Sequence, residues 1–208
     1  TDDIYVGYRY FETIPGAAEK VVYPFGYGLS YTTFDVETVS AGVVNSNCTS
    51  EANKLYAKVR VTNTGKFSGK EVVQVYIAKP QGKLGKPAKE LAAFEKTREL
   101  QPGESQLMIL TWEINDMASY DDLGKVKKSA YVLEAGSYDI YVGTSVRDVT
   151  KADYSYILNH DVITEQLSAK LVPTSLPKRM LADGSYEALP QSEPVDTDYS
   201  AIGNIDPS

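Results

Sequence analysis

The side chains of this sequence that could carry out chemistry are few and far apart. His160 is the only histidine, and Cys48 is the only cysteine. A transition-metal site needs several such ligands. A serine nucleophile would need that one histidine together with a Gly-x-Ser-x-Gly turn, which the sequence lacks. We therefore interpret His160 as a solvent-facing residue on or just after the last strand.

Three aspartates near one turn, Asp116, Asp121 and Asp122, resemble a set of calcium ligands. An EF-hand loop that began at Asp116 would carry a glutamate at its twelfth position, where Lys127 stands. Paired carboxylates for sugar hydrolysis come from distant positions, but the acidic residues here lie mostly opposite the apolar faces of strands, as solvated charges do. The sequence predicts turn aspartates and no catalytic, metal-binding or cofactor-binding residue.

Two glycine-containing stretches begin like nucleotide-binding motifs. Residues 26–28 open like a dinucleotide fingerprint, but Tyr31 occupies the position of the third glycine. Gly69-Lys70 is similar to the end of a phosphate loop, but Glu71 replaces the required hydroxyl residue. We interpret the first stretch as a turn and the second as a hairpin turn.

The densest feature of the chain is aromatic. Residues 23–34 contain five aromatic rings, two glycines and one proline. Proline fixes one backbone dihedral and glycine permits left-handed turns, so this composition predicts an irregular, rigid connector whose rings need a surface to cover. Just upstream, residues 4–9 carry apolar side chains on both faces and predict a short strand.

From Phe34 onward, apolar and polar residues alternate in short segments separated by turn signals. Residues 133–142 place a turn before Tyr138, Ile140 and Val142, which is typical of the tyrosine corner of immunoglobulin-like sandwiches. About seven strands without a convincing amphipathic helix predict an all-β fold, an antiparallel β-sandwich with an irregular N-terminal connector and a C-terminal tail. The predicted strands are 34–39, 55–62, 73–77, 91–95, 107–111, 138–142 and 154–163.

The composition of the whole chain restricts its partners. Its 208 residues suffice for one large domain or a medium domain with extensions. A net charge of −7 argues against nucleic acid, and no apolar run is long enough to span a membrane. The lone Cys48 excludes an intrachain disulfide, which favours the bacterial cytoplasm, with secretion as the alternative. The N-terminus lacks a signal-peptide pattern and looks like a chain entered midway.

Several motifs of this sequence occur together in one known family. They are VGYRYF at residues 6–11, YPFGYGLSYT at 23–32, VTNTG at 61–65, GKEVVQVY at 69–76, KEL at 89–91, FEK at 94–96, LQPGES at 100–105 and YDIYVG at 138–143. In this order and spacing they resemble glycoside hydrolase family three, the β-glucosidases and their relatives. There, a similar segment joins an α/β sandwich domain to a fibronectin type III-like domain. The resemblance extends from residue 4 to residue 150.

This resemblance implies an accessory module of a larger enzyme. Family members carry the aspartate nucleophile on a barrel domain and the acid/base glutamate usually on the α/β sandwich domain, and no motif for either matches this sequence. The implied organisation is a connector at 1–33, a fibronectin type III-like domain at 34–164 and an extended linker or tail at 165–208. The chain is expected to be a structural fragment, inactive alone, of a retaining β-glucosidase-like enzyme that hydrolyses terminal β-linked sugars.

The expected partners of the module are the barrel and α/β sandwich domains of the parent enzyme. Family members usually end soon after the fibronectin-like domain, whereas this chain continues past residue 164. A permuted order, with the barrel after the sandwich, is our hypothesis for that tail. The expected interdomain contact residues are Tyr8, Arg9, Tyr10, Phe11, Phe25, Tyr27 and Tyr31.

The alternative function is a carbohydrate-binding module with an oligosaccharide as its partner. The sixteen tyrosines of the chain would then supply rings that stand in line on one exposed sheet face and stack on sugar rings. The aromatic residues are instead concentrated before the sandwich, and this distribution favours the structural function over the binding function.

Overall fold

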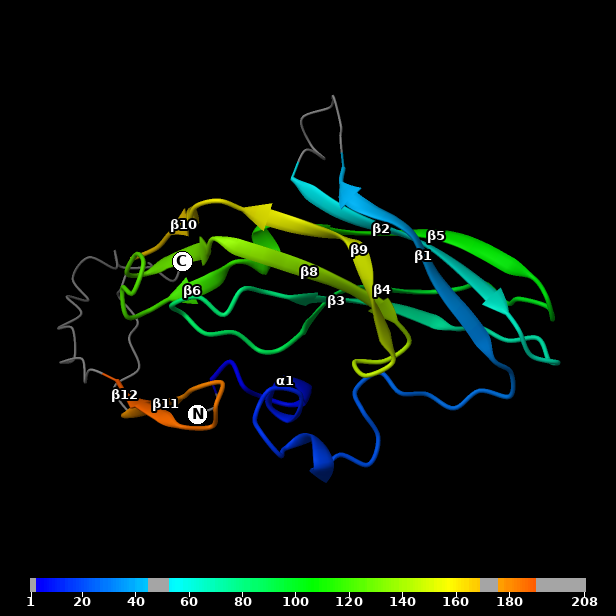
Figure 1. Ribbon diagram of the computed structural model, residues 1–208, viewed down its shortest axis with the longest axis horizontal. Coiled ribbons are helices and arrows are strands. Elements are labelled where there is room, and N and C mark those ends of the chain that lie inside the picture. The colour runs from blue at the N-terminus through cyan, green and yellow to red at the C-terminus, as the bar shows by residue number, and fades with distance from the viewer. Residues whose placement is uncertain (1–2, 45–52, 169–175, 190–208) are drawn as a thin grey trace, which may run out of the picture.

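The computed structural model describes residues 3–44, 53–168 and 176–189. Cys48 and part of the predicted C-terminal tail lie outside these ranges. The described chain is a two-layer β-sandwich with shorter elements toward both termini (Figure 1). The prediction of an all-β sandwich is thereby confirmed. None of the helices in these ranges has the length and apolar character of a membrane span.

Two antiparallel sheets make the sandwich. One has three strands in the order β1-β2-β5, and the other has four in the order β4-β3-β8-β9. Each of the seven predicted strands contributes to one of these sheets, although the boundaries differ. The strands are β1 (Phe34–Val43), β2 (Lys54–Asn63), β3 (Val72–Ala78), β4 (Glu90–Lys96), β5 (Ser105–Glu113), β8 (Gly136–Gly143) and β9 (Val149–Leu158).

Alternating side chains from both sheets form one hydrophobic core. In β2, Leu55, Ala57, Val59 and Val61 are fully buried, while the residues between them are more exposed. Fully burying a valine or leucine side chain contributes about 1.5–3 kcal/mol, so this alternation is the main source of stability of the sandwich. Other members of the core are Val73, Val75 and Ile77 of β3, Met108, Leu110 and Trp112 of β5, and Tyr138, Ile140 and Val142 of β8.

The predicted tyrosine corner is present at the start of β8. The Tyr138 ring is buried, and its hydroxyl donates a hydrogen bond of 2.9 Å to the backbone carbonyl of Glu134. Gly136, between them, has a φ of 140°, and a Cβ atom there would lie 2.6 Å from the Cβ atom of Pro80. The Glu134 side chain is itself buried and forms an ion pair with Lys86. The turn is therefore held from both the backbone and the side chain of Glu134.

The last predicted strand, 154–163, is two strands. β9 ends at Leu158, and after a bend that contains the exposed His160, β10 (Val162–Gln166) begins. His160 is thus solvent-facing, as predicted. β10 pairs with β7 (Ala130–Leu133), which pairs with β6 (Ser119–Asp121), and these three form a third small sheet. Strands of three to five residues carry too little alternation to be predicted.

The prediction of a hairpin turn at Gly69-Lys70 is wrong. The strands on either side, β2 and β3, belong to different sheets, so this segment crosses from one layer to the other. Gly69 forms an isolated antiparallel bridge with Leu100, with N···O distances of 3.1 and 2.8 Å. A glycine marks a change of chain direction but carries no information about which sheet the next strand joins.

The predicted strand at residues 4–9 is also wrong. Gly7 has a φ of 58°, a left-handed value that interrupts an extended chain, and residues Tyr8–Phe11 form a single helical turn, α1. The 3₁₀ helices are η1 (Ala18–Lys20) and η2 (Asn115–Met117). Near the C-terminus, β11 (Lys178–Met180) and β12 (Tyr186–Ala188) form a hairpin that the sequence did not predict.

The corner hydroxyl can be tested by replacing Tyr138 with phenylalanine. This change leaves the buried carbonyl of Glu134 without its donor, and we expect a loss of about 1–3 kcal/mol in the free energy of unfolding. Urea denaturation measures that loss. The matched control is Tyr31→Phe, which makes the same chemical change on a ring that is 96% exposed and should leave stability unchanged. Equal effects of the two substitutions would contradict the structural function of the corner.

Candidate functional site

The N-terminal connector covers the outer face of the four-stranded sheet. In β3, Gln74 and Tyr76 alternate with the core residues and therefore point away from the core, yet they are 5% and 0% exposed. In Figure 1 the dark blue segment with α1 runs along the side of this sheet that faces away from β1 and β2. β3 is thus buried on both faces, by the core on one side and by the connector on the other.

Tyr8 attaches the connector to the sheet. Its ring stacks on Phe25, with centroids 4.4 Å apart, and meets the edge of Tyr76 at 6.2 Å. Its hydroxyl accepts a hydrogen bond of 2.8 Å from the backbone N–H of Leu91 in β4. Burial raises the pKa of Tyr8, so the hydroxyl stays neutral. One side chain therefore joins the helical turn, the later part of the connector and two strands.

Ion pairs fix the helical turn from two directions. Arg9 contacts Glu90 of β4 at 3.2 Å, and Glu90 also pairs with Lys79 at 2.5 Å. Glu12 accepts from Arg147, which follows β8, at 2.8 Å. These contacts hold α1 against β4 on one side and against the segment after β8 on the other, and they set its orientation.

Gln74 holds the second half of the connector. Its Nε2 group donates to the backbone carbonyls of Gly26, at 3.2 Å, and Thr144, at 2.6 Å. Its Oε1 atom accepts from the hydroxyl of Tyr76 at 2.6 Å. Gly26 has a φ of 82°, and the N–H of Tyr27 donates to the carbonyl of Pro24, which closes a turn over residues 24–27 that overlaps the turn predicted at residues 26–28. The predicted turn is therefore the point where the connector binds the sheet.

A run of apolar side chains on this anchored connector faces solvent. We call Val22, Tyr23, Phe25, Tyr27, Leu29 and Tyr31 the exposed strip. Leu29 is 88% exposed and Tyr31 is 96% exposed, and Tyr23 stacks on Tyr27 with centroids 5.2 Å apart. Contiguous exposed apolar surface on a soluble protein marks an interaction site.

The seven predicted contact residues have two different environments. Tyr8 and Arg9 contact the sheet of this chain, and Tyr10 and Phe11 are half-buried and meet edge to face at 5.3 Å. Phe25 packs one face on Tyr8 and is still 43% exposed. The other two, Tyr27 and Tyr31, belong wholly to the exposed surface. The predicted contact residues did not include Val22, Tyr23 and Leu29. Tyr23 and Leu29 lie in the same aromatic stretch, and Val22 directly precedes it.

Two of the three turn aspartates, Asp121 and Asp122, have structural partners. Asp121 is buried and accepts hydrogen bonds from four successive backbone N–H groups, those of residues 124–127, at 2.7–3.1 Å. Burial alone would raise the pKa of Asp121, but these donors outweigh it and hold the pKa below its ordinary value. Asp122 binds Arg179, and Asp116 is exposed. In the ranges that the structure describes, no three or more His, Cys, Asp or Glu side chains are grouped to hold a metal ion.

Comparison with known proteins agrees with this architecture. The family described as fibronectin type III-like domain matches residues 71–146, from the end of the β2–β3 crossover to just beyond β8. Beta-glucosidase A of Butyrivibrio fibrisolvens is 62% identical over 210 residues, covering 97% of this chain and 25% of that protein. A beta-glucosidase of Ruminococcus albus is 43% identical over 208 residues, covering 98% of this chain and 21% of that protein.

A solved structure shows the same relation in three dimensions. The beta-glucosidase of Paenibacillus barengoltzii superimposes with a TM-score of 0.77 at 46% identity, over 92% of this chain and 22% of that one. The fold is thus a fibronectin type III-like sandwich with a covering connector. The chain is thus similar, over nearly its whole length, to one part of beta-glucosidases of glycoside hydrolase family three, and that part contains the fibronectin type III-like domain. It spans about a quarter of the length of the first curated relatives that it matches.

The attachment of the connector can be tested at Gly26. A Cβ atom there would lie 2.1 Å from Oε1 of Gln74, and the left-handed backbone costs a non-glycine residue about 1–2 kcal/mol. We expect Gly26→Ala to speed hydrogen exchange of the Val146 amide, which donates to the carbonyl of Phe25. Gly28→Ala is the control, because nothing lies within 4 Å of its Cβ position. Unchanged exchange in Gly26→Ala would contradict the assigned attachment.

Proposed function

We propose that this chain is the accessory, structural part of a β-glucosidase-type glycosidase, and that it stabilises the catalytic domains by binding them through the exposed strip. The observation that carries this proposal is an apolar surface held rigidly on the outside of an otherwise well-packed sandwich. In support, the relatives are named beta-glucosidases, and about three quarters of their length lies outside the match. The proposed segments are the connector 1–33, the sandwich 34–164 and the linker or tail 165–208.

The anchoring of the connector supports docking through the exposed strip. Tyr8 and Gln74 attach the connector to the sheet, so its rings are already ordered before any partner arrives. Binding then costs little conformational entropy, and each apolar Å² buried contributes roughly 25 cal/mol. Within the proposed contact set, Tyr8 and Arg9 orient the connector. The exposed strip, which contains Phe25, Tyr27 and Tyr31, forms the surface toward the barrel and α/β sandwich domains, and the half-buried Tyr10 and Phe11 lie at its edge in this proposal.

The carboxylates of this chain support an inactive module. Retaining glycosidases place two carboxyl groups about 5–5.5 Å apart on either side of the sugar bond. In this chain, several carboxylates are already paired with a lysine or arginine at structural positions. They are Glu12, Glu90, Glu134 and Asp139. We therefore assign hydrolysis of terminal β-linked sugars to the parent enzyme and not to this chain.

The carbohydrate-binding alternative is not favoured. Such a module needs exposed rings in line on one sheet face. In the described part of the chain the exposed rings outside the connector are scattered, with Phe67 between β2 and β3, Phe94 on β4, Tyr120 on β6, Tyr131 on β7 and Tyr186 on β12. Only Tyr120 and Tyr131 among these are paired, at 5.4 Å.

The isolated chain should hydrolyse no aryl β-glucoside. Highly purified protein incubated with a chromogenic β-glucoside measures this directly, and the parent enzyme serves as the positive control. Turnover that a single carboxylate substitution in this chain abolishes would overturn the assignment. Calorimetry with cello-oligosaccharides on the same sample should show no heat of binding, and saturable binding would revive the alternative.

The proposed contact can be tested in the parent enzyme with the double change Leu29→Ser and Tyr31→Ser. We expect the half-life of activity at elevated temperature to fall about tenfold or more, because burying one such side chain contributes about 1.5–3 kcal/mol. Values of kcat and KM before heating should stay the same. The matched control is Leu107→Ser with Ile109→Ser, two side chains on β5 that are 49% and 59% exposed. Similar losses for both pairs would contradict docking through the strip.

A further inference from the structure

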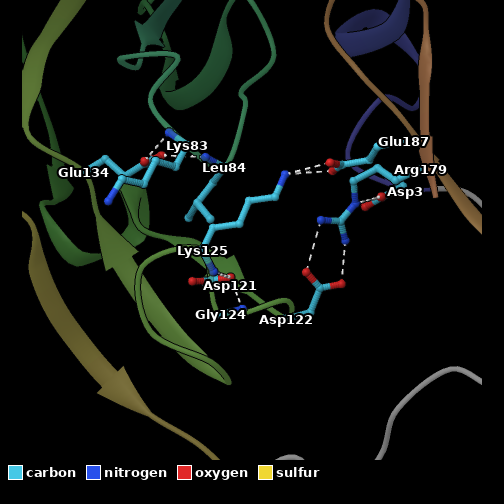
Figure 2. A network of polar contacts seen from close by, with 10 residues as sticks. All are labelled: Asp3, Lys83, Leu84, Asp121, Asp122, Gly124, Lys125, Glu134, Arg179 and Glu187. Atoms are coloured by element: carbon cyan, nitrogen blue, oxygen red, sulfur yellow. Dashed lines mark hydrogen bonds and ion pairs between the residues drawn. The ribbon is translucent and has the colours of Figure 1, made fainter. Parts of the chain in front are cut away.

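The C-terminal hairpin is attached to the rest of the chain by charged groups. Figure 2 shows Arg179 of β11 between Asp3 and Asp122. Its Nε atom lies 2.6 Å from Oδ2 of Asp3, and its two terminal nitrogens lie 3.1 and 2.6 Å from the two carboxylate oxygens of Asp122. Beside this group, Lys125 donates to both carboxylate oxygens of Glu187 in β12, at 2.8 and 2.9 Å.

These ion pairs are a large part of the attachment, because the hairpin itself is small. Its ladder contains three residue pairs, Lys178–Ala188, Arg179–Glu187 and Met180–Tyr186. A two-stranded hairpin of this kind is marginally stable in water on its own. No residue of β11 or β12 is fully buried, and Met180, Leu181 and Ala182 are half-buried where the hairpin meets residues 4–5.

Partial burial makes the arginine contact stronger than an ordinary surface pair. The side chains of Arg179 and Asp3 are 15% and 23% exposed, whereas those of the surface pair Arg60 and Glu37 are 48% and 56% exposed. A guanidinium that binds one carboxylate through two parallel hydrogen bonds has a fixed geometry that a lysine cannot reproduce. Burial alone would lower the pKa of Arg179, but Asp122 and Asp3 outweigh it and raise the pKa, so the charge is kept.

The surface that receives the hairpin is held in place before the hairpin binds. The four N–H groups that bind Asp121 fix the loop that carries Lys125. Glu134 does the same for the neighbouring loop, because its carboxylate accepts from the N–H groups of Lys83 and Leu84. This second loop, residues 4–5 and residues 179–183 of the hairpin line one cleft of about 300 Å³.

We infer that the surface formed by Asp3, Asp122 and Lys125 is a docking site for the hairpin Lys178–Ala188, which acts as a strap that can open while the sandwich stays folded. The strap joins residues 176 positions apart in the sequence. It therefore fixes the segment that follows the sandwich beside the start of the connector. A domain attached through either segment would then move together with the sandwich.

Hydrogen exchange on the full 208-residue chain tests this inference. The amides of Leu181, Gly184 and Leu189 are bonded within the hairpin region and report its opening. We expect Arg179→Gln to speed their exchange about tenfold or more, because it removes the charged hydrogen bonds that hold the hairpin on Asp3 and Asp122. Arg179→Lys should have an intermediate effect. The control Arg60→Gln breaks a surface ion pair elsewhere and should leave the hairpin unchanged.

Two further readouts separate a strap from general stability. Amides of β2 and β3 should exchange at the wild-type rate in Arg179→Gln, whereas equal acceleration in the core would overturn the inference. Asp122→Asn should speed hairpin exchange in the wild-type background and have little further effect beside Arg179→Gln, because the two side chains act as one contact. Additive effects, or a hairpin whose exchange does not respond to Arg179→Gln, would overturn it as well.

Discussion

The structure depends on the burial of β3 from both sides. A sandwich needs only one buried face per sheet, but here the outward-facing Gln74 and Tyr76 are as inaccessible as the core residues between them. A buried glutamine and a buried tyrosine hydroxyl must have hydrogen-bond partners. They satisfy one another and bind the carbonyls of Gly26 and Thr144. The connector is therefore a third layer of the fold.

This third layer explains why a strongly apolar surface can stay exposed. A flexible aromatic tail would collapse onto the nearest apolar surface, whereas the exposed strip is held by the turn at Gly26 and the stack of Tyr8 on Phe25. Leu29 and Tyr31 are thus exposed on an ordered segment. This is the arrangement of apolar side chains in a domain interface and differs from that in a disordered linker. The position of the strip, outside both sheets of the sandwich, leaves room for a large partner.

Sequence reasoning succeeded where the determinants are local. The strand at 55–62 was predictable because one face is buried along its whole length, and the corner at Tyr138 because a turn and its tyrosine lie within five residues. It failed where the determinants are distant. Nothing in the neighbouring sequence distinguishes Tyr8, whose ring packs against other parts of this chain, from Leu29, whose side chain faces solvent. The contact of Arg179 with Asp3 joins the two ends of the described chain, so no window of sequence could contain it.

The carboxylate of Asp121 has a consequence for acid tolerance. Its pKa is depressed in the folded protein by four backbone donors that outweigh the effect of burial, so the stability that it contributes is present above the ordinary aspartate range and is lost as the pH falls through the lower, folded value. Protonation there would loosen the loop that carries Lys125 while the apolar core keeps its packing. A fall in pH should therefore weaken the corner of the protein at which Arg179 meets Asp3 and Asp122.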